Sequence, residues 1–183
     1  MPGPDEATLI QRACHMDKAA IGELYRRHVQ AIYRYVTYRV GDAHLAEDLT
    51  AEVFVRAIEG LPAYEDRGVP FSSWLYSIAR ARVADHFRRL ARTQTVPLES
   101  EGVIDKGFIL SETEQAAPDR RLRSALERLT VDQQQVILLK FVEGLSNAEI
   151  AQIMDKTEGA IKSLQHRALK TLHRLIDESD EPR

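Results

Sequence analysis

Basic side chains gather on one face of the last predicted helix, which follows a turn at residues 155–156. At about 100° per residue, the apolar side chains of this helix fall within a narrow arc, which predicts a core-facing side. The members of that arc are Ile161, Leu164, Ala168, Leu172 and Leu175. The opposite side carries Gly159, Lys162, Ser163, His166, Arg167, Lys170, His173 and Arg174. Arginine can bond a guanine through two hydrogen bonds, and lysine or serine can reach a base or a phosphate, so this face predicts contact with DNA.

The residues before this helix match the plan of a helix-turn-helix. Ser146 and Glu149 form a capping box that opens a helix of only about eight residues. A tight turn follows, and Thr157 can cap the last helix, whose first turn holds the acidic Glu158 where the helix dipole favours it. The alternative is an ordinary helical hairpin with a solvated basic face. The short first helix, the caps and the turn favour the helix-turn-helix.

A preceding helix completes this C-terminal part. Thr130 and Gln133 form a capping box at its start, and Gly144 is placed to end it. The apolar residues of this helix include Val136, Ile137 and Phe141. Their spacing is that of a helix.

Helical periodicity also fills the first half of the chain. One pattern runs from Ile21 to Val40, and another, with Asp42 as its N-cap, places apolar residues at Leu49, Val53, Phe54, Ala57, Ile58 and Leu61. Residues 61–73 contain two prolines and a glycine and predict a loop. Ser72 or Ser73 is then expected to cap a helix from Trp74 to about Arg89.

Residues 93–118 differ in composition from both halves. This segment holds five acidic residues, one lysine, two prolines and two glycines, and it lacks sustained helical periodicity. The sequence therefore predicts an all-α protein in which two small helical domains are joined by a flexible acidic linker. The expected boundaries are 1–92 for the first domain, 93–118 for the linker, 119–177 for the second domain and 178–183 for an acidic tail.

The bulk composition limits the class of protein. The 183 residues carry a net charge of −3 and a single cysteine, Cys14, so no internal disulfide can form. No apolar run approaches the roughly 18–20 residues needed to span a bilayer, and the N-terminus lacks the pattern of a signal peptide. We expect a cytoplasmic protein without direct membrane insertion. An acidic chain with one basic helix face suits DNA binding together with a partner better than DNA binding alone.

Three segments resemble the sigma-70 family of bacterial RNA polymerase sigma factors, specifically the extracytoplasmic-function (ECF) group. The stretch from Leu126, LERLTVDQQQVILLKFVEGLSNAEIAQIMDKTEGAIKSLQHRALKTLHRLI, resembles region 4. AEDLTAEVFVRAI, at residues 46–58, resembles region 2.2, and FSSWLYSIARARVADHFRR, at residues 71–89, resembles regions 2.3 and 2.4. The segments occur in the family's order with a linker between them, and they cover most of the chain.

The resemblance implies roles for individual residues. Region 2.2 of the family docks on the clamp of the largest catalytic subunit of core RNA polymerase, and the matching positions are Asp48, Glu52, Phe54 and Arg56. Regions 2.3 and 2.4 hold the melted non-template strand of the −10 element, a task that suits aromatic platforms and cations. The matching candidates are Tyr64, Arg67, Phe71, Trp74, Arg80, Arg82, Arg88 and Arg89. For the −35 duplex they are Glu158, Lys162, Ser163, His166, Arg167 and Lys170.

Two positions depart from the family pattern. Ala81 stands where relatives often carry asparagine, and an alanine side chain cannot bond a base edge. Leu164-Gln165 stands where many relatives have Arg-Leu; since Leu164 falls on the core arc, Gln165 is the change expected to affect the surface. The −10 preference is therefore expected to differ from that of relatives with asparagine.

Other classes of function explain less of the sequence. A free-standing helix-turn-helix repressor or response-regulator output domain would explain residues 119–176 but not the aromatic and arginine-rich segment before the linker. An enzyme is not expected, because the chain lacks HExxH, a phosphate-binding glycine loop and clustered carboxylates with a base. No cofactor or metal is expected, since the six histidines are scattered. A purely protein-binding module is partly compatible, because the family is commonly controlled by an anti-sigma factor.

Overall fold

The computed structural model describes residues 5–93, 125–126 and 128–177. The described residues contain helices and no strands, which confirms the all-α class. Four α-helices and a short 3₁₀ helix form an N-terminal bundle: α1 (Glu6–Cys14), α2 (Lys18–Val40), α3 (Ala43–Gly60), η1 (Leu61–Ala63) and α4 (Phe71–Thr93). The C-terminal bundle contains α6 (Val131–Ile137), the π-helix η2 (Leu138–Val142), α7 (Asn147–Met154) and α8 (Glu158–Asp177). Most of the predicted linker lies outside the described residues.

Side-chain caps fix where α2 and α3 begin. The Asp17 carboxylate accepts hydrogen bonds from the backbone N–H groups of Ala19 (2.9 Å) and Ala20 (3.2 Å) at the start of α2. Asp42 accepts one from Leu45 N–H at 2.7 Å, which confirms it as the N-cap of α3. Between these helices Gly41 adopts φ 71°, a left-handed conformation that glycine reaches without strain. The sequence thus turns α3 back against α2 through a single short connection.

The start of α4 differs from the prediction. The helix begins at Phe71, three residues before the expected Trp74, and it extends to Thr93, past the expected end at Arg89. The N–H of Ser73 donates to the carbonyl of Pro70 at 2.9 Å, so the helical bonding starts before either serine. Ser72 and Ser73 as N-caps are therefore wrong. The loop is also shorter than predicted, because its first residues form η1 and its last ones belong to α4.

The helix starts predicted for the C-terminal bundle are confirmed. Thr130 and Gln133 form a complete capping box before α6, and Ser146 with Glu149 forms a second one before α7. Thr157 caps α8 by accepting from Ala160 N–H at 3.2 Å. The turn between α7 and α8 uses Asp155 in the left-handed conformation, φ 52°.

The helix that starts at Thr130 changes its hydrogen bonding before it ends. After Ile137 it continues as the π-helix η2, and Gly144 (φ 70°) follows. A π-helix has more residues per turn than an α-helix, so residues beyond Ile137 are rotated relative to a continued α-helix. Phe141 is 60% exposed, whereas Val136 and Ile137, before the change, are buried.

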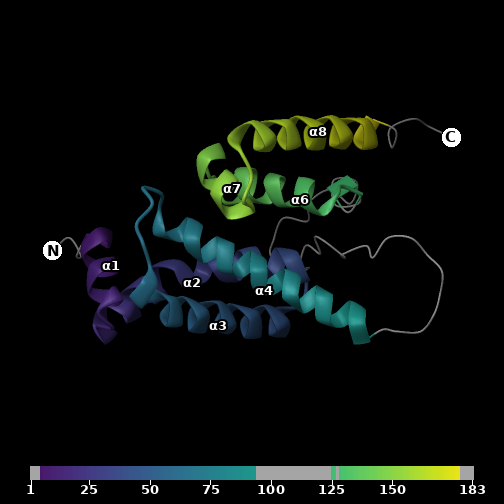
Figure 1. Ribbon diagram of the computed structural model, residues 1–183. Helices are drawn as coiled ribbons and strands as arrows, with labels where there is room; N and C mark the ends of the chain where they lie inside the picture. Colours follow the sequence, from purple (N-terminus) through teal and green to yellow (C-terminus); the bar gives the residue numbers. More distant parts are fainter. Residues whose placement is uncertain (1–4, 94–124, 127, 178–183) are drawn as a thin grey trace.

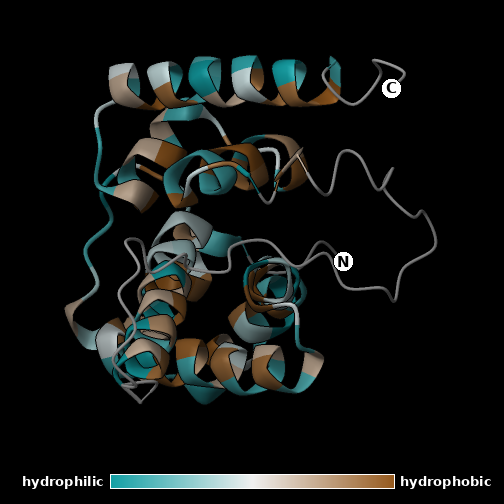
Figure 2. Cartoon of the chain, turned by 90° about the vertical axis from the view of Figure 1, so that its right-hand side faces the viewer, coloured by the Kyte–Doolittle hydropathy of each residue, from teal (hydrophilic) through white to brown (hydrophobic). Residues whose placement is uncertain are grey.

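The two bundles pack against each other through α4 and α7. In Figure 1, α4 crosses α2, α3 lies below them, and α6 and α7 lie between α4 and the outermost helix α8. Figure 2 shows the hydrophobic side of α8 turned toward α6 and α7 and its hydrophilic side turned outward. The helix with the basic face therefore lies on the side of the C-terminal bundle away from the N-terminal bundle.

Candidate nucleic-acid and polymerase interfaces

The basic face of α8 is exposed along its length. All five side chains of the predicted core arc of α8 are buried, from Ile161 at 0% exposed to Leu164 and Leu172 at 8%. The predicted contacts on the other side are all exposed: Glu158, Lys162, Ser163, His166, Arg167 and Lys170. Arg167 donates from Nε to the carbonyl of Ser163 at 3.4 Å, one turn back on the same face. The helix thus presents cations and the Ser163 side chain to solvent from a backbone packed through the buried arc, as a recognition helix must.

Contacts between α7, α8 and α6 fix the angle of this helix. Gln165 donates from Nε2 to Oδ1 of Asn147 at 2.9 Å, so the amide at the unusual position is tied to the first residue of α7. Lys156 in the turn pairs with Asp132 of α6 at 3.1 Å. Ile150, Ile153 and Met154 of α7 are buried beneath. Gln165 is half-buried, and its hydrogen bond turns it toward α7.

A cavity of about 500 Å³ lies beside the start of α4. Its walls come from Gly60, Ala63, Tyr64, Glu65, Arg67, Val69, Ser73, Trp74, Ser77 and Gln152. The ring centroids of Tyr64 and Trp74 are 4.8 Å apart with planes tilted by 56°, and the ring of Phe71 lies 5.4 Å from each. An aromatic wall beside an exposed arginine can stack a base and pair with its phosphate.

The three rings hold different positions in this cluster. Phe71 is 4% exposed, so it supports the other rings from within the core. Trp74 and Tyr64 are half-buried, and both line the cavity. Burial is the largest cause that raises the pKa of the Tyr64 phenol, and the negative charge of Asp66 raises it further. Arg67 is exposed in the loop. Of the predicted residues, Tyr64, Arg67 and Trp74 are thus brought together, whereas Phe71 is behind them.

Gly60 is a cavity residue that the sequence reasoning missed. A Cβ at this position would lie 3.0 Å from Cζ2 and 3.4 Å from Cη2 of Trp74. The backbone of Gly60 has an ordinary helical conformation, φ −84°. The glycine is therefore required by the close approach of the indole and not by its backbone angle. A lone glycine at the end of a predicted helix gave no signal of that approach.

The remaining arginines of α4 lie farther along the helix. Arg82 and Arg88 both donate to the carboxylate of Asp85, and these three residues line a shallow cavity of about 290 Å³ with Arg89 and Arg92. Four guanidinium groups around one carboxylate give this surface a net positive charge. Arg80, closer to the helix start, is half-buried and donates to Oε1 of Gln135 at 3.4 Å. Ala81 beside it is exposed.

A different surface covers the outer side of α3. Asp48, Glu52 and Arg56 are exposed and follow one another at intervals of four residues, so they form one stripe. Arg56 also pairs with Glu59 at 3.1 Å. Phe54 is 7% exposed and its ring contacts Tyr25 edge-on at 4.8 Å. The structure thus brings three of the four predicted residues to the surface and directs Phe54 into the core.

Polar contacts between the bundles were not predicted. The Glu143 carboxylate accepts hydrogen bonds from Nε (3.0 Å) and Nη2 (2.7 Å) of Arg34 and from the Tyr76 hydroxyl (2.7 Å). The hydrogen bond to Glu143 raises the pKa of Arg34. Burial, and then the hydrogen bond to Glu143, raise the pKa of the Tyr76 phenol. A single acid before a helix-ending glycine carries no sequence signal of a partner more than a hundred positions away.

The described part of the chain holds no group of three or more histidine, cysteine, aspartate and glutamate side chains able to bind a metal ion. None of the described helices is both long enough and apolar enough to cross a membrane.

Family models match both halves of the chain. The model described as Sigma-70 region 2 matches residues 24–93, and the model described as Sigma-70, region 4 matches residues 119–172. The first match covers α3, α4 and most of α2. The second covers the helix-turn-helix and most of its basic face.

Several known proteins resemble the whole chain. The ECF RNA polymerase sigma factor BldN of Streptomyces coelicolor is 41% identical over 174 residues, which are 92% of this chain and 64% of BldN. The chain thus spans somewhat less than two thirds of that relative. SigX of Bacillus subtilis, also an ECF sigma factor, is 33% identical over 84% of this chain and 82% of its own length.

Solved structures show the same fold at lower identity. CnrH, solved with the cytosolic domain of CnrY, matches with a TM-score of 0.68 and 24% identity over 95% of this chain and 97% of that chain. The sigma factor RpoE of Bartonella quintana, solved with the anti-sigma factor NepR, matches with a TM-score of 0.66 and 22% identity over 87% of this chain and 98% of that chain.

Proposed function

Because the chain belongs to the sigma-70 family and resembles its ECF sigma factors along most of its length, we propose that it directs core RNA polymerase to specific promoters. Residues 1–92 act as region 2, residues 119–177 act as region 4, and residues 93–118 connect them. Region 2 docks on polymerase and holds the melted −10 strand. Region 4 reads the −35 duplex. Nucleotide addition is left to the polymerase, and no cofactor is used.

The observation that carries this proposal is that one chain has two chemically different surfaces suited to DNA. The face of α8 is cationic and carries no phenylalanine, tyrosine or tryptophan, which fits the major groove of an intact duplex. The surface of α4 combines a cavity lined by aromatic rings with a row of arginines, which fits unpaired bases and their phosphates. A repressor that binds only duplex DNA has no use for the second surface.

The cavity beside α4 is suited to a base flipped out of the stack. Its volume of about 500 Å³ exceeds that of a single nucleobase, and Tyr64 and Trp74 form one wall. We assign Tyr64, Arg67 and Trp74 to base and phosphate contacts, with Phe71 as the support behind them. Arg82, Arg88 and Arg89 are assigned to the backbone that follows. Ala81 offers only a methyl group, so it contributes no base-edge hydrogen bond.

The stripe on α3 is suited to a polymerase helix. Asp48, Glu52 and Arg56 place charges of both signs on one exposed edge. Such a pattern favours one orientation of a partner helix that docks there. Val55 beside them is 55% exposed and adds an apolar contact. We therefore assign the clamp contact to the exposed residues of this stripe, and Phe54 to the packing that holds the stripe in place.

The net charge of −3 supports action within a complex. A duplex-binding protein that works alone usually has a basic surface, whereas this chain has 28 acidic side chains against 25 lysines and arginines. Weak binding by the free chain would keep it from occupying promoters without polymerase. An anti-sigma factor is the proposed regulator, as for the sigma factor RpoE of Bartonella quintana that shares the fold. The cytoplasm, where polymerase acts, is the proposed compartment.

In vitro transcription tests this proposal. Core RNA polymerase with the purified chain is offered a library of promoters, and transcript ends are sequenced. We expect transcripts that share a −35 and a −10 motif and that require the chain. The proposal fails if no promoter gives chain-dependent transcripts. The proposal that the chain acts only together with polymerase also fails if the chain alone binds promoter duplex tightly at physiological salt.

A further inference from the structure

A buried serine hydroxyl lies at the cavity beside α4. Ser73 is 2% exposed, and it lines this cavity together with Tyr64 and Trp74. Its Oγ is buried and makes no hydrogen bond to any residue that the structure describes. Since burying a hydroxyl without a partner costs free energy, such a group in a folded protein calls for a physical reason. A ligand that enters the cavity would supply the missing partner.

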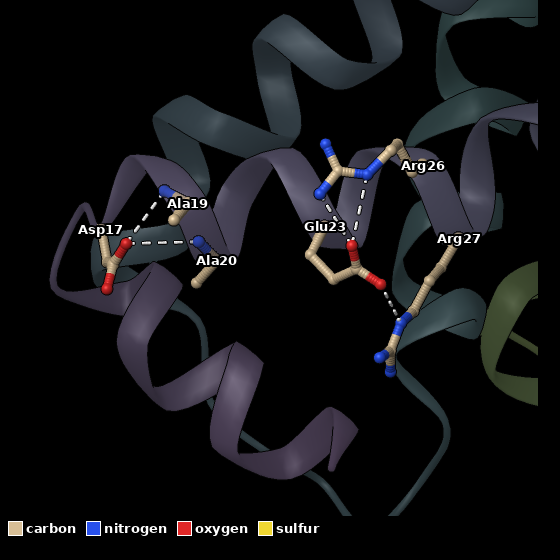
Figure 3. A network of polar contacts seen from close by, with 6 residues as sticks. All are labelled: Asp17, Ala19, Ala20, Glu23, Arg26 and Arg27. Atoms are coloured by element: carbon tan, nitrogen blue, oxygen red, sulfur yellow. Dashed lines mark hydrogen bonds and ion pairs between the residues drawn. The ribbon is translucent and has the colours of Figure 1, made fainter. Parts of the chain in front are cut away.

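A polar side chain at the start of another helix shows the usual arrangement. In Figure 3, the Asp17 carboxylate accepts hydrogen bonds from the backbone N–H groups of Ala19 and Ala20, in the first turn of α2. Ser73 lies in the first turn of α4, but its hydroxyl bonds no backbone group among the described residues. Its own N–H is already bonded to the carbonyl of Pro70. The start of the helix therefore does not explain the buried hydroxyl.

A second serine lies one turn farther along the same face of α4. Ser77 also lines the cavity, four residues after Ser73, a spacing that places the two Cβ atoms about 5–6 Å apart. The Ser77 hydroxyl donates its hydrogen to the carbonyl of Trp74 at 2.6 Å. The Ser77 oxygen can therefore only accept a hydrogen bond from a ligand, whereas the Ser73 hydroxyl can donate one or accept one.

These two serines fit a base that carries an exocyclic amine. The Ser77 oxygen can accept from the amine of cytosine, adenine or guanine, while the Ser73 hydroxyl bonds the ring nitrogen next to that amine. Thymine has no exocyclic amine. Its carbonyl oxygens would face the lone pairs of Ser77 or the carboxylate of Glu65, which also lines the cavity, and two acceptors form no hydrogen bond. Thymine is therefore the base that this cavity is expected to reject.

We propose that the Ser73 hydroxyl forms a hydrogen bond to the edge of the flipped −10 base and that this base carries an exocyclic amine. The inference rests on the proposed function, because it concerns which base the cavity accepts. Tyr64 and Trp74 can stack on the face of any base, so stacking does not distinguish one base from another. Ser73 and Ser77 meet the edge, where the bases differ. Ser73 is therefore a specificity-determining residue of the cavity.

Binding to modified −10 strands tests the contact. Holoenzyme that contains the full-length chain is titrated with fluorescent single-stranded oligonucleotides, which carry the non-template −10 sequence of a promoter that the chain transcribes. An abasic site is placed at each position of the element in turn. Wild type, Ser73→Ala and Ser72→Ala are compared. Ser72 is the matched control, because it is a half-buried serine next to Ser73 that does not line the cavity.

We expect Ser73→Ala to bind the intact strand about fivefold more weakly than wild type, and Ser72→Ala to bind it like wild type. With the abasic site at the flipped position, Ser73→Ala and wild type should bind equally, because the base that Ser73 contacts is missing. At every other position the fivefold difference should persist. The contact is refuted if Ser73→Ala binds the intact strand like wild type, or if its loss is the same for every abasic strand.

Base replacement at the flipped position tests which base the cavity accepts. The four bases are placed there in turn, and the affinity of wild-type holoenzyme for each strand is measured. Thymine should bind about tenfold more weakly than the best of cytosine, adenine and guanine, because it alone offers no amine to Ser77. Binding of thymine as tight as that of the other bases, or tighter, would overturn the assignment of a base with an exocyclic amine.

The stability of the free chain separates this contact from a role in the fold. Ser73→Ala removes a buried hydroxyl without a partner, so its midpoint of chemical denaturation should equal or exceed that of wild type. A lower midpoint would show that the fold itself uses the hydroxyl, and it would overturn the inference. If wild type directs no transcription from any promoter, the proposed function fails. Transcription by wild type, with strand binding by Ser73→Ala unchanged, would refute only the role of Ser73.

Discussion

The hydroxyl of Tyr35 accepts a hydrogen bond of 2.7 Å from the side-chain amide of Gln135, and both groups are buried. Tyr35 lies in the core of the N-terminal bundle, and Gln135 follows it by a hundred positions in the C-terminal bundle. The two bundles are therefore joined by a polar contact that excludes water, and not only by apolar surface. Such a contact is sensitive to the loss of one hydroxyl group.

Tyr35→Phe removes that hydroxyl and leaves the Gln135 amide without its acceptor. We expect a loss of about 1–2 kcal/mol in the free energy of unfolding, because a buried donor is then unpaired. Chemical denaturation measures the loss. Tyr33→Phe, at a half-buried tyrosine of the same helix, should change stability less. Equal stability of Tyr35→Phe and wild type would mean that the contact contributes nothing in solution.

Gly60→Ala tests the aromatic wall of the cavity. The added methyl would lie 3.0 Å from Cζ2 of Trp74, so the indole has to move. Since Trp74 is the only tryptophan, its fluorescence reports the movement directly. We expect a shifted emission spectrum and binding of the −10 strand by holoenzyme that is weaker by roughly 1 kcal/mol, within the range of one base–aromatic stack.

The matched control for this change is Gly22→Ala on α2. A Cβ there would meet only the end of Arg26 at 3.7 Å, an ordinary contact. Gly22→Ala should therefore leave the fluorescence and the binding unchanged. If Gly60→Ala behaves in the same way, Trp74 does not form the wall that a base would meet.

Arg167→Ala tests the recognition face of α8. The substitution removes an exposed cation from the first half of the helix without touching the buried arc. Binding to promoters with an intact −35 element should weaken by about 1–3 kcal/mol, and transcription from them should fall accordingly. The affinity for core polymerase should stay unchanged. Arg174→Ala, two turns later on the same face, should have a smaller effect. A loss of core binding by Arg167→Ala would assign this residue to polymerase instead of DNA.

Asp17 links the stability of the N-terminal bundle to pH. The hydrogen bond from Arg12, followed by that from the N–H of Ala20, holds the pKa of Asp17 below its ordinary 3.8. The stabilisation is therefore present above that value and is lost as the pH falls through the lowered pKa. Asp17→Asn keeps a capping side chain but cannot pair with the charge of Arg12.

Thermal unfolding at several pH values checks this link. At pH 7 the Asp17→Asn protein should melt a few degrees below wild type. The gap should close only as the pH falls through the lowered pKa of Asp17, because the wild-type carboxylate is then protonated as well. A gap of constant size at all pH values would show that the cap, and not the charge, makes the difference.

The sequence predicted what short-range rules control. The caps at Asp42, Thr130, Ser146 and Thr157 follow from side chains three residues from the groups that they bond. The buried arc of α8 follows from helical periodicity. These features need no knowledge of the rest of the chain.

Other features depend on tertiary structure and were missed or wrong. The π-helix leaves Phe141 at the surface, and no residue type indicates that change of hydrogen bonding. Ser73 resembles a cap, yet the carbonyl of Pro70 already bonds its N–H. The roles of Glu143 and Gln135 depend on their hydrogen-bond partners on α2 and α4, which lie far away in the sequence.

The central claim is that two surfaces of one chain read a duplex and an opened strand on the same promoter. Site-specific photocrosslinking in the open complex measures this directly, with a photoreactive amino acid at Tyr64 or at Ser163. The account predicts that position 64 crosslinks to the non-template strand of the −10 element and that position 163 crosslinks to the −35 duplex. Crosslinks from both positions to one element, or from position 64 to protein alone, would contradict it.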